Sequence, residues 1–269
     1  MDKEWARRVR VIEKELKSVA KLEKKLCKAA LNAKPAPFKT AVENKIPQKI
    51  YFALESTFSK GFSLVFSQGR GLIEKTYKKE NIQNNHAIRD YAVQLKGSRK
   101  ELKRMHKSAR RSDSLNVVVT TAEGIALGAL GIGMPDIVLF LSTLLRGIFE
   151  TALNYGYDYE SRTEQYIILK MMAASLTYGE AWEEENNEVD ELMLEEALTV
   201  TEDALNTQLK QTASVFAMDM LLIKFIQGLP IVGIIGGAAN PIYYNRVVKY
   251  VQLKYRKRYL LKQYRGYQV

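Results

Sequence analysis

Residues 117–158 read VVVTTAEGIALGALGIGMPDIVLFLSTLLRGIFETALNYGYD, and this stretch decides the predicted fold. It is an apolar segment interrupted at its middle by GIGMPD, residues 131–136. Pro135 has no N–H and a fixed φ, so it suits the first turn of a helix and not a helix interior. The pattern predicts two apolar helices joined by a tight Gly-Pro turn, with the second helix ending near Tyr155 and Gly156.

A second apolar segment has the same plan. Residues 221–244 read LLIKFIQGLPIVGIIGGAANPIYY, with GLP at 228–230 inside the run and NP at 240–241 near its end. Both segments follow the order of apolar arm, glycine and proline, and second apolar arm, without enough identity to form a sequence repeat. We predict two similar helical hairpins that pack together.

The rest of the chain also shows the helical period, and no β-alternation of useful length occurs. At 269 residues the chain is long enough for a sizeable core, and its 46% apolar and 26% charged residues are those of an ordinary folded protein. We predict an all-α, multi-helix globular bundle. Its regions are a basic amphipathic N-terminal helix (1–34), a basic helical region (35–111) and a helical core (112–269), expected to form one compact domain.

The net charge of +11 is unevenly distributed along the chain. Residues 1–111 hold 28 Lys and Arg against 11 Asp and Glu, and residues 220–269 hold nine basic residues and no acidic one. Residues 181–219 hold 11 acidic residues against one basic. Basic ends around an acidic middle indicate either an anionic partner for the ends or an acidic segment that neutralises them within the fold.

Residues 3–32 are predicted to form one long amphipathic helix, because Trp5, Val9, Ile12 and their successors recur every three or four positions. Its other face is rich in Lys and Arg. One interpretation is a solvated helix that covers the core. The other is a basic helix lying on an anionic membrane, with Trp5 at the interface. Further basic helices are predicted over 86–111 and 247–264, and an acidic helix over 180–205.

A helix that crosses a bilayer needs about 20 mostly apolar residues. Each arm of the two hairpins is shorter, and each whole segment is broken by Gly and Pro. We expect buried core helices first, shallow or re-entrant hairpins second and a true transmembrane helix a distant third. The mean hydropathy of −0.23 fits a soluble or peripheral protein. The charged first residues show no secretory signal, and the single Cys27 suits a reducing compartment, so a cytoplasmic location is expected.

The sequence carries none of the common enzyme motifs. His86, His106 and the one cysteine do not form a zinc pattern. No nucleophile elbow, Walker loop or dinucleotide fingerprint occurs. The basic stretch 86–111 lacks the stacking aromatics or groove-reading motif of a nucleic-acid-binding protein. The sequence therefore predicts no cofactor and no metal site, and it does not favour nucleic acid as a partner.

Polar residues that flank the apolar arms are the candidate binding residues. Arg146 and Glu150 are four positions apart and can pair on one helix face, and Asp136 can sit in a first helical turn, where the dipole favours a negative charge. The alternative is a polar cluster at the mouth of an apolar pocket, with Arg146 holding an acyl carboxylate or a phosphate. The candidate ligand-binding residues are Asp136, Arg146, Glu150, Tyr155, Tyr157, Asp158, Gly228, Pro230 and Asn240.

Several of these motifs resemble those of the EcsC family. They are PDI at 135–137, LLRGIFE at 144–150, YGYD at 155–158, GLPIVG at 228–233, and the glycine pair at 236–237 with Asn240. The resemblance covers residues 110–262. It implies a largely helical protein with links to membranes and transport, since the family is named for a protein encoded beside the subunits of a bacterial ABC transporter. It supplies no established catalytic residues.

Three hypotheses of function follow. The first is a non-enzymatic protein that binds anionic lipid or a fatty acid between the hairpins, or attaches to the inner face of the bacterial cell membrane. The second is an accessory protein that docks on ABC transporter subunits through the acidic helix 181–205. The third is a lipid-directed enzyme using Asp136, Glu150 and Asp158. The residues expected to face a membrane are Trp5, Arg7, Arg8, Lys254, Arg256, Lys257 and Arg258.

Overall fold

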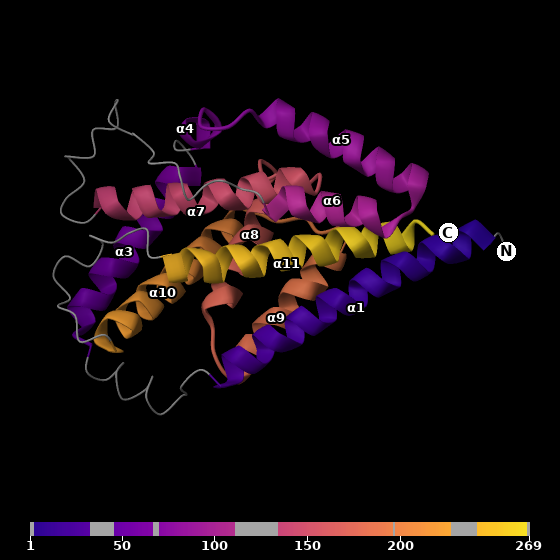
Figure 1. Cartoon of the computed structure of the whole chain (residues 1–269). Coiled ribbons are helices and arrows are strands. Elements are labelled where there is room, and N and C mark those ends of the chain that lie inside the picture. Colours follow the sequence, from indigo (N-terminus) through magenta and orange to yellow (C-terminus); the bar gives the residue numbers. More distant parts are fainter. Residues whose placement is uncertain are drawn as a thin grey trace.

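The computed structural model describes residues 3–32, 46–66, 70–110, 134–195, 197–226 and 241–267. Every regular element in these ranges is a helix, as predicted (Figure 1). The helices are α1 (Lys3–Asn32), α3 (Gln48–Leu64), α4 (Arg70–Glu74), α5 (Lys79–Lys96), α6 (Arg99–Arg110), α7 (Met134–Asn154), α8 (Arg162–Leu176), α9 (Glu180–Leu194), α10 (Glu202–Ile226) and α11 (Pro241–Arg265).

Helix α7 forms the centre of the bundle and packs against α3, α4, α5, α6 and α11. It begins at Met134, which places Pro135 in its first turn, and it ends at Asn154, both as predicted. Within the described ranges, α7 is the one helix long and apolar enough to cross a membrane, and 89% of its window Ile137–Asn154 is buried in the fold. The core helix of a soluble protein meets the same criterion, so this length is weak support for a membrane span.

Aromatic side chains fill the core on both sides of α7. Phe216 of α10 packs against Phe58 and Phe62 of α3, with ring centroids 5.6 and 5.5 Å apart. Phe149 of α7 stacks on Tyr159, with centroids 4.2 Å apart. All five side chains are fully buried. Such rings bury the largest apolar areas in a protein, so these contacts fix how α3 and α10 sit on α7.

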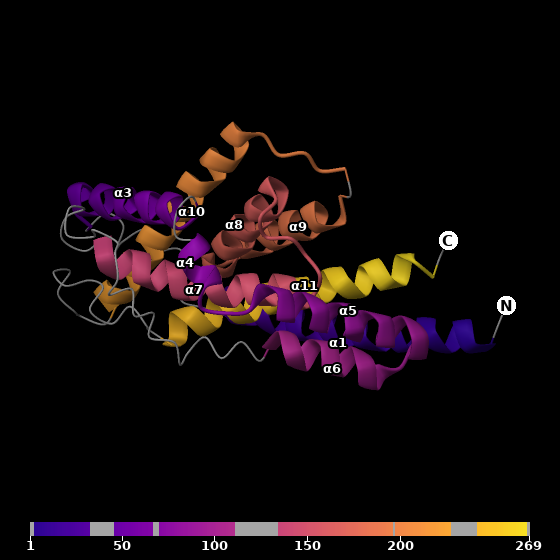
Figure 2. The same ribbon diagram turned by 90° about the horizontal axis from the view of Figure 1, so that it is seen from above.

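Helices α1 and α11 pack side by side in opposite directions, which brings the two ends of the chain together (Figures 1 and 2). The indole N–H of Trp5 donates to the carbonyl of Tyr267 at 3.1 Å. Ile12 and Val19 on the predicted apolar stripe are buried against the core. The structure therefore matches the interpretation of α1 as a helix that covers the core.

Two of the predicted helices end earlier than expected. The single helix predicted over 86–111 is two helices, α5 and α6, because Gly97 turns the chain between them at a φ of +50°. This left-handed conformation is one that glycine adopts readily. The acidic helix predicted over 180–205 stops at Leu194, and α10 begins at Glu202.

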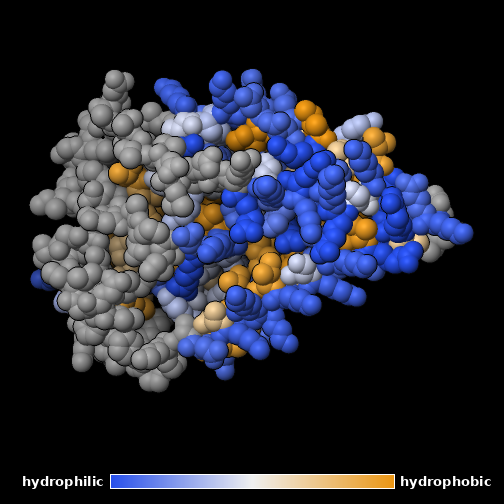
Figure 3. Space-filling model, in the orientation of Figure 1, coloured by the Kyte–Doolittle hydropathy of each residue, from blue (hydrophilic) through white to orange (hydrophobic). Residues whose placement is uncertain are grey.

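The surface over α1, α5 and α6 is predominantly hydrophilic (Figure 3).

Candidate functional site

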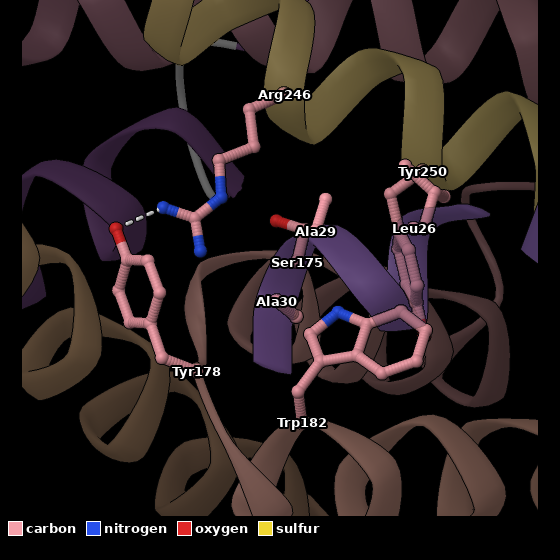
Figure 4. Close-up of a pocket in the computed structure, with 8 residues that line it drawn as sticks. All are labelled: Leu26, Ala29, Ala30, Ser175, Tyr178, Trp182, Arg246 and Tyr250. Carbon is pink, nitrogen blue, oxygen red and sulfur yellow. Dashed lines mark hydrogen bonds between the residues drawn. The ribbon is translucent and has the colours of Figure 1, made fainter. Parts of the chain in front are cut away.

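A pocket of about 290 Å³ lies where α1, α8, α9 and α11 meet, and we call it the Arg246 pocket (Figure 4). Its walls are mainly apolar and aromatic, and one guanidinium group reaches into it. It is half enclosed by its walls. The residues that line it are Leu26, Ala29, Ala30, Ser175, Tyr178, Trp182, Arg246 and Tyr250.

Local structure explains why space remains at this junction. Helix α1 contributes two small side chains there, Ala29 and Ala30, beside Leu26, so its last turn does not fill the gap. The chain turns from α8 into α9 at Gly179, whose φ is +64° and whose N–H donates to the Ala30 carbonyl at 3.2 Å. This bond holds α1 against the turn. Opposite, Trp182 of α9 meets the edge of Tyr250 of α11, with centroids 6.1 Å apart, and the two rings form an aromatic wall.

Arg246 is held in place by three groups. Its Nη1 donates to the hydroxyl of Tyr178 and, at 3.4 Å, to Oδ1 of Asp219. Its Nη2 donates to the carbonyl of Thr177 at 3.1 Å, and the guanidinium lies 4.2 Å from the centroid of the Tyr178 ring. In Figure 4 the guanidinium lies between Tyr178 and Ser175. A planar cation fixed in this way is preorganised for an oxygen anion.

Asp219 forms an ion pair with Arg246 and is the more buried of the two partners. The side chain of Asp219 is 3% exposed, whereas that of Arg246 is 27% exposed, so the positive group is the one that reaches the opening. Oδ1 of Asp219 also accepts a hydrogen bond from the Tyr178 hydroxyl at 2.6 Å. Burial, followed by the nearby Asp219 carboxylate, raises the pKa of Tyr178, so its hydroxyl stays protonated at neutral pH.

The arrangement suits a small amphipathic anion. Apolar and aromatic walls favour a hydrocarbon group, and a positioned Arg at one end favours a carboxylate or phosphate. At about 30 Å³ per water-sized group, a pocket of about 290 Å³ holds on the order of ten such groups. The pocket therefore has room for a medium-chain acid or for one end of a longer lipid.

Arg146 and Glu150 form the ion pair that their spacing predicts. Nε of Arg146 donates to Oε1 of Glu150 at 2.9 Å, and both residues are buried. Nη1 of Arg146 is also buried and has no hydrogen-bond partner among the described residues. The pair lies on the core helix α7, and it lines neither the Arg246 pocket nor the second pocket described below.

Each of the three predicted residues that follow α7, Tyr155, Tyr157 and Asp158, contacts a partner in the fold. The Tyr155 hydroxyl lies 2.9 Å from Nδ1 of His106, and the ring of Tyr157 lies 4.0 Å from the guanidinium of Arg258. Oδ1 of Asp158 accepts the backbone N–H of Glu160 at 3.0 Å, which closes a turn. Tyr155 comes nine residues after Arg146, roughly 13 Å along a helix axis. The structure therefore does not gather these residues and Arg146 into one cluster.

The remaining predicted ligand-binding residues fall outside what the structure describes. Gly228, Pro230 and Asn240 lie outside the described ranges, as do residues 111–133 of the first predicted hairpin. Asp136 belongs to the first turn of α7, as predicted, but its side chain is not among those described. The predicted lipid site between the two hairpins stays a prediction.

The N-terminal residues expected at a membrane surface, Trp5, Arg7 and Arg8, make contacts within the fold, and their contact with a membrane stays a prediction. Trp5 is half-buried and holds the C-terminal end of the chain through the bond given above. Arg8 donates to two of the last carbonyls of α5, at 2.6 and 2.9 Å, and Arg7 donates to the carbonyl of Lys96 at 3.3 Å. Cations at a helix C-terminus satisfy carbonyls that lack partners and interact favourably with the helix dipole.

Lys254 and Lys257 of α11 belong to a four-residue charge network, which we call the Lys254 network. Lys254 has none of its side chain exposed and donates to Oε1 of Glu23 at 2.5 Å and to Oδ1 of Asp190 at 2.7 Å. Lys257, 22% exposed, donates to the other oxygens of the same carboxylates at 2.8 and 2.6 Å. The network joins α1, α9 and α11.

The other two basic residues predicted on α11 are paired in the same way. Arg256 donates to Glu15 at 2.5 Å, and both side chains are at most 10% exposed. Arg258 binds both oxygens of the Glu164 carboxylate, at 2.9 and 2.8 Å. The expectation that Lys254 and Arg256 face a membrane is therefore corrected, because their charged groups lie inside the helix packing and are already neutralised.

Sequence reasoning missed the residues of the Arg246 pocket, although a signal for two of them was present. Arg246 is the first charged residue after Lys224, at the end of a long uncharged run, just as Arg146 interrupts the first apolar segment. Asp219 is a lone carboxylate between apolar neighbours. A charge inside an apolar run indicates a buried partner. Trp182 and Tyr178 carried no comparable signal.

Over the ranges that the structure describes, no group of three or more His, Cys, Asp or Glu residues is placed to hold a metal ion. Of the three carboxylates proposed for a lipid-directed enzyme, two have described side chains, Glu150 and Asp158. Glu150 pairs with Arg146, and Asp158 closes a turn.

The sequence matches the model of the EcsC protein family over residues 13–260. No curated protein and no solved structure matches the chain. The match begins within α1 and ends within α11, so it includes the N-terminal basic helices, for which the sequence motifs alone gave no correspondence. The chain belongs to the EcsC protein family.

Proposed function

We propose that this protein is a non-enzymatic lipid-binding protein that holds a fatty acid, or the acidic end of a small lipid, in the Arg246 pocket. The observation that carries the proposal is the guanidinium of Arg246 at one end of a mainly apolar pocket. This keeps the predicted ligand class and moves the proposed anchor from Arg146 to Arg246. Attachment to the inner face of the cell membrane would give the protein access to such a ligand.

The partly buried position of Arg246 supports a specific site over a general surface attraction. Exposed charges in water are screened and contribute little, whereas a charge-assisted hydrogen bond in a partly enclosed pocket is worth about 1.5–3 kcal/mol. That range corresponds to a preference of roughly tenfold to a hundredfold for an acid over a neutral ligand of the same shape. The apolar walls favour both ligands equally.

Trp182 provides a direct reporter of binding. The chain has two tryptophans, and Trp5→Phe leaves only Trp182, which lines the pocket. We expect decanoate to change the emission of Trp182 in a saturable way. Decanol, which has the same chain without the carboxylate, should bind at least ten times more weakly. Native mass spectrometry of the protein purified from cells, followed by organic extraction, would identify a ligand already bound.

Two variants of α1 separate pocket binding from nonspecific association. Ala29→Phe places a ring in the pocket without removing a charge, and we expect it to abolish the response of Trp182. Ala20→Phe adds the same ring at an exposed position of α1 that does not line the pocket, and it should leave binding unchanged. Equal binding of decanoate to both variants, or equal affinity for acid and alcohol, would overturn the proposal.

The transporter-accessory function remains the second candidate, and one observation favours it. Asp190 on the inner side of α9 is bound by lysines of α11, whereas Glu183, Glu184 and Glu191 face solvent and form no ion pair among the described residues. Changing these three residues to Gln should abolish a pull-down with transporter subunits and leave decanoate binding intact. An unchanged pull-down would remove this candidate.

A further inference from the structure

A second pocket, of about 300 Å³, lies along α6, and we call it the α6 pocket. It is lined by Lys103, His106, Lys107 and Arg110. Their spacing of three and four residues places them on one face of the helix. Among the described residues, none of those that line this space is acidic, and three of the four carry a positive charge at neutral pH.

Within the part of the chain that the structure describes, the three cations of the α6 pocket have no partner, in contrast to the four paired cations of α11 that lie between Lys254 and Arg258. Among the described residues, Lys103, Lys107 and Arg110 form no hydrogen bond or ion pair through their side chains, although Glu101 on the same helix pairs with Arg104. Like charges four residues apart repel by about 0.2–0.5 kcal/mol. The helix dipole favours Lys107 and Arg110 in the last turn, but its effect falls off before Lys103. A bound anion would relieve this repulsion.

His106 adds a neutral donor to the same pocket. Tyr155 is 3% exposed, and its hydroxyl has Nδ1 of His106, 2.9 Å away, as its one partner among the described residues. A buried hydroxyl needs an acceptor, so we assign Tyr155 as the donor and Nδ1 as the acceptor. Burial lowers the pKa of His106 to about 4 and raises that of Tyr155, so both groups are neutral at pH 7. The imidazole proton then lies on Nε2.

We propose that the α6 pocket binds the phosphate group of a phosphomonoester. Two lysine ammonium groups, one guanidinium and one imidazole N–H supply only donors, and a phosphate monoester is mostly a dianion at neutral pH, whose oxygens are acceptors. At about 30 Å³ per heavy atom, the five atoms of a phosphate occupy about half of the 300 Å³, which leaves space for the group that carries it. The phosphate can come from a soluble compound or from a lipid headgroup.

The test measures binding of two probes to the full chain. Calorimetry with glycerol 3-phosphate detects a soluble ligand, and co-sedimentation with vesicles that contain phosphatidic acid detects a lipid headgroup. Vesicles of phosphatidylcholine alone are the neutral reference. We expect saturable binding of at least one probe, and a shift of the His106 Nε2 resonance in nitrogen-15 NMR when glycerol 3-phosphate binds.

A matched pair of variants distinguishes a site from general attraction to a basic surface. Lys103→Gln with Lys107→Gln removes two charges from the pocket, and we expect at least a tenfold loss of affinity. Lys96→Gln with Lys100→Gln removes the same charge from exposed positions outside it, with at most a twofold loss expected. Equal losses in both double variants, or no binding of either probe, would overturn the proposal. Binding of the vesicles alone, lost only in the first variant, would support it and identify the lipid source.

This inference is independent of the proposed function. The α6 pocket shares no lining residue with the Arg246 pocket. Ala29→Phe should therefore leave phosphate binding unchanged, and the pair of changes at Lys103 and Lys107 should leave decanoate binding unchanged. Either proposal can fail while the other stands.

Discussion

Replacing Lys254 by Met is expected to destabilise the protein more than any other single removal of a charge from α11. The ammonium group is fully buried between Glu23 and Asp190, at 2.5 and 2.7 Å. Methionine keeps the apolar length of the lysine stem, so the change removes the charge and opens little space. Two carboxylates, 15% and 20% exposed, would then share Lys257 as their one cation in the network.

The magnitude follows from the burial of the network. Removing one partner of a buried ion pair costs about 3–5 kcal/mol, because an uncompensated charge stays behind. Lys257 makes bonds of similar length but is 22% exposed, so water partly replaces it, and Lys257→Met should cost about 1 kcal/mol. Burial opposes ionisation of Glu23, but Lys254 and Lys257 outweigh it and lower the pKa of Glu23, which shows that the lysines stabilise the ionised form.

Urea unfolding followed by circular dichroism measures both free energies of unfolding. We expect Lys254→Met to lose at least about 2 kcal/mol more than Lys257→Met. Adding Glu23→Gln and Asp190→Asn to Lys254→Met should recover part of the loss, since both carboxylates are then neutral and the one charge left in the network, Lys257, is partly exposed to water. A loss below about 1 kcal/mol for Lys254→Met, or no recovery in the triple variant, would refute the reasoning.

Two further predictions concern Gly156 and His106. Gly156→Ala should lower the free energy of unfolding in urea more than Gly179→Ala. Both glycines have a positive φ, which costs an alanine about 1–3 kcal/mol. Of the two, only Gly156 has a neighbour that the new Cβ would meet, Nε2 of His86 at 2.3 Å. Equal costs would contradict the steric argument. The pKa of His106 is about 4 in the folded state and 6.5 in the unfolded state, so neutral His106 stabilises the fold relative to the unfolded chain. This contribution to the free energy of unfolding is complete above pH 6.5. It is lost as the pH falls towards 4, and the loss is at most about 3 kcal/mol. Unfolding at pH 7 and pH 4.5 should show this loss in the native protein and not in His106→Asn.

Local spacing was enough to predict the features that depend on one helix. The period of apolar residues gave the limits of α1, and the position of Pro135 gave the start of α7. The pairing of Arg146 with Glu150 followed from their separation of four residues. None of these features needs a contact between distant parts of the chain.

The features that depend on several helices could not be predicted in this way. Helix α11 looks like a solvated basic helix, because polar residues surround it on every side. Lys254 and Arg256 are nevertheless buried, because carboxylates 64 and 241 positions away along the chain meet them in the fold. The Arg246 pocket likewise combines α1, α8, α9 and α11, and a gap between helices leaves no pattern in a single sequence.

The pairing of charges also decides where an anionic partner can bind. The sequence left two explanations for the basic ends, an anionic partner or neutralisation by the acidic segment. In the structure four cations of α11 are paired within the fold, and of their carboxylate partners only Asp190 belongs to the acidic segment 181–219, whereas Glu15, Glu23 and Glu164 do not. Among the described residues, Lys103, Lys107 and Arg110 of α6 form no ion pair, so their charges stay available to an anionic partner. A loss of lipid binding after mutation of Lys254 would therefore reflect unfolding, whereas the same loss after mutation of Lys103 and Lys107, with stability unchanged, would reflect a binding site.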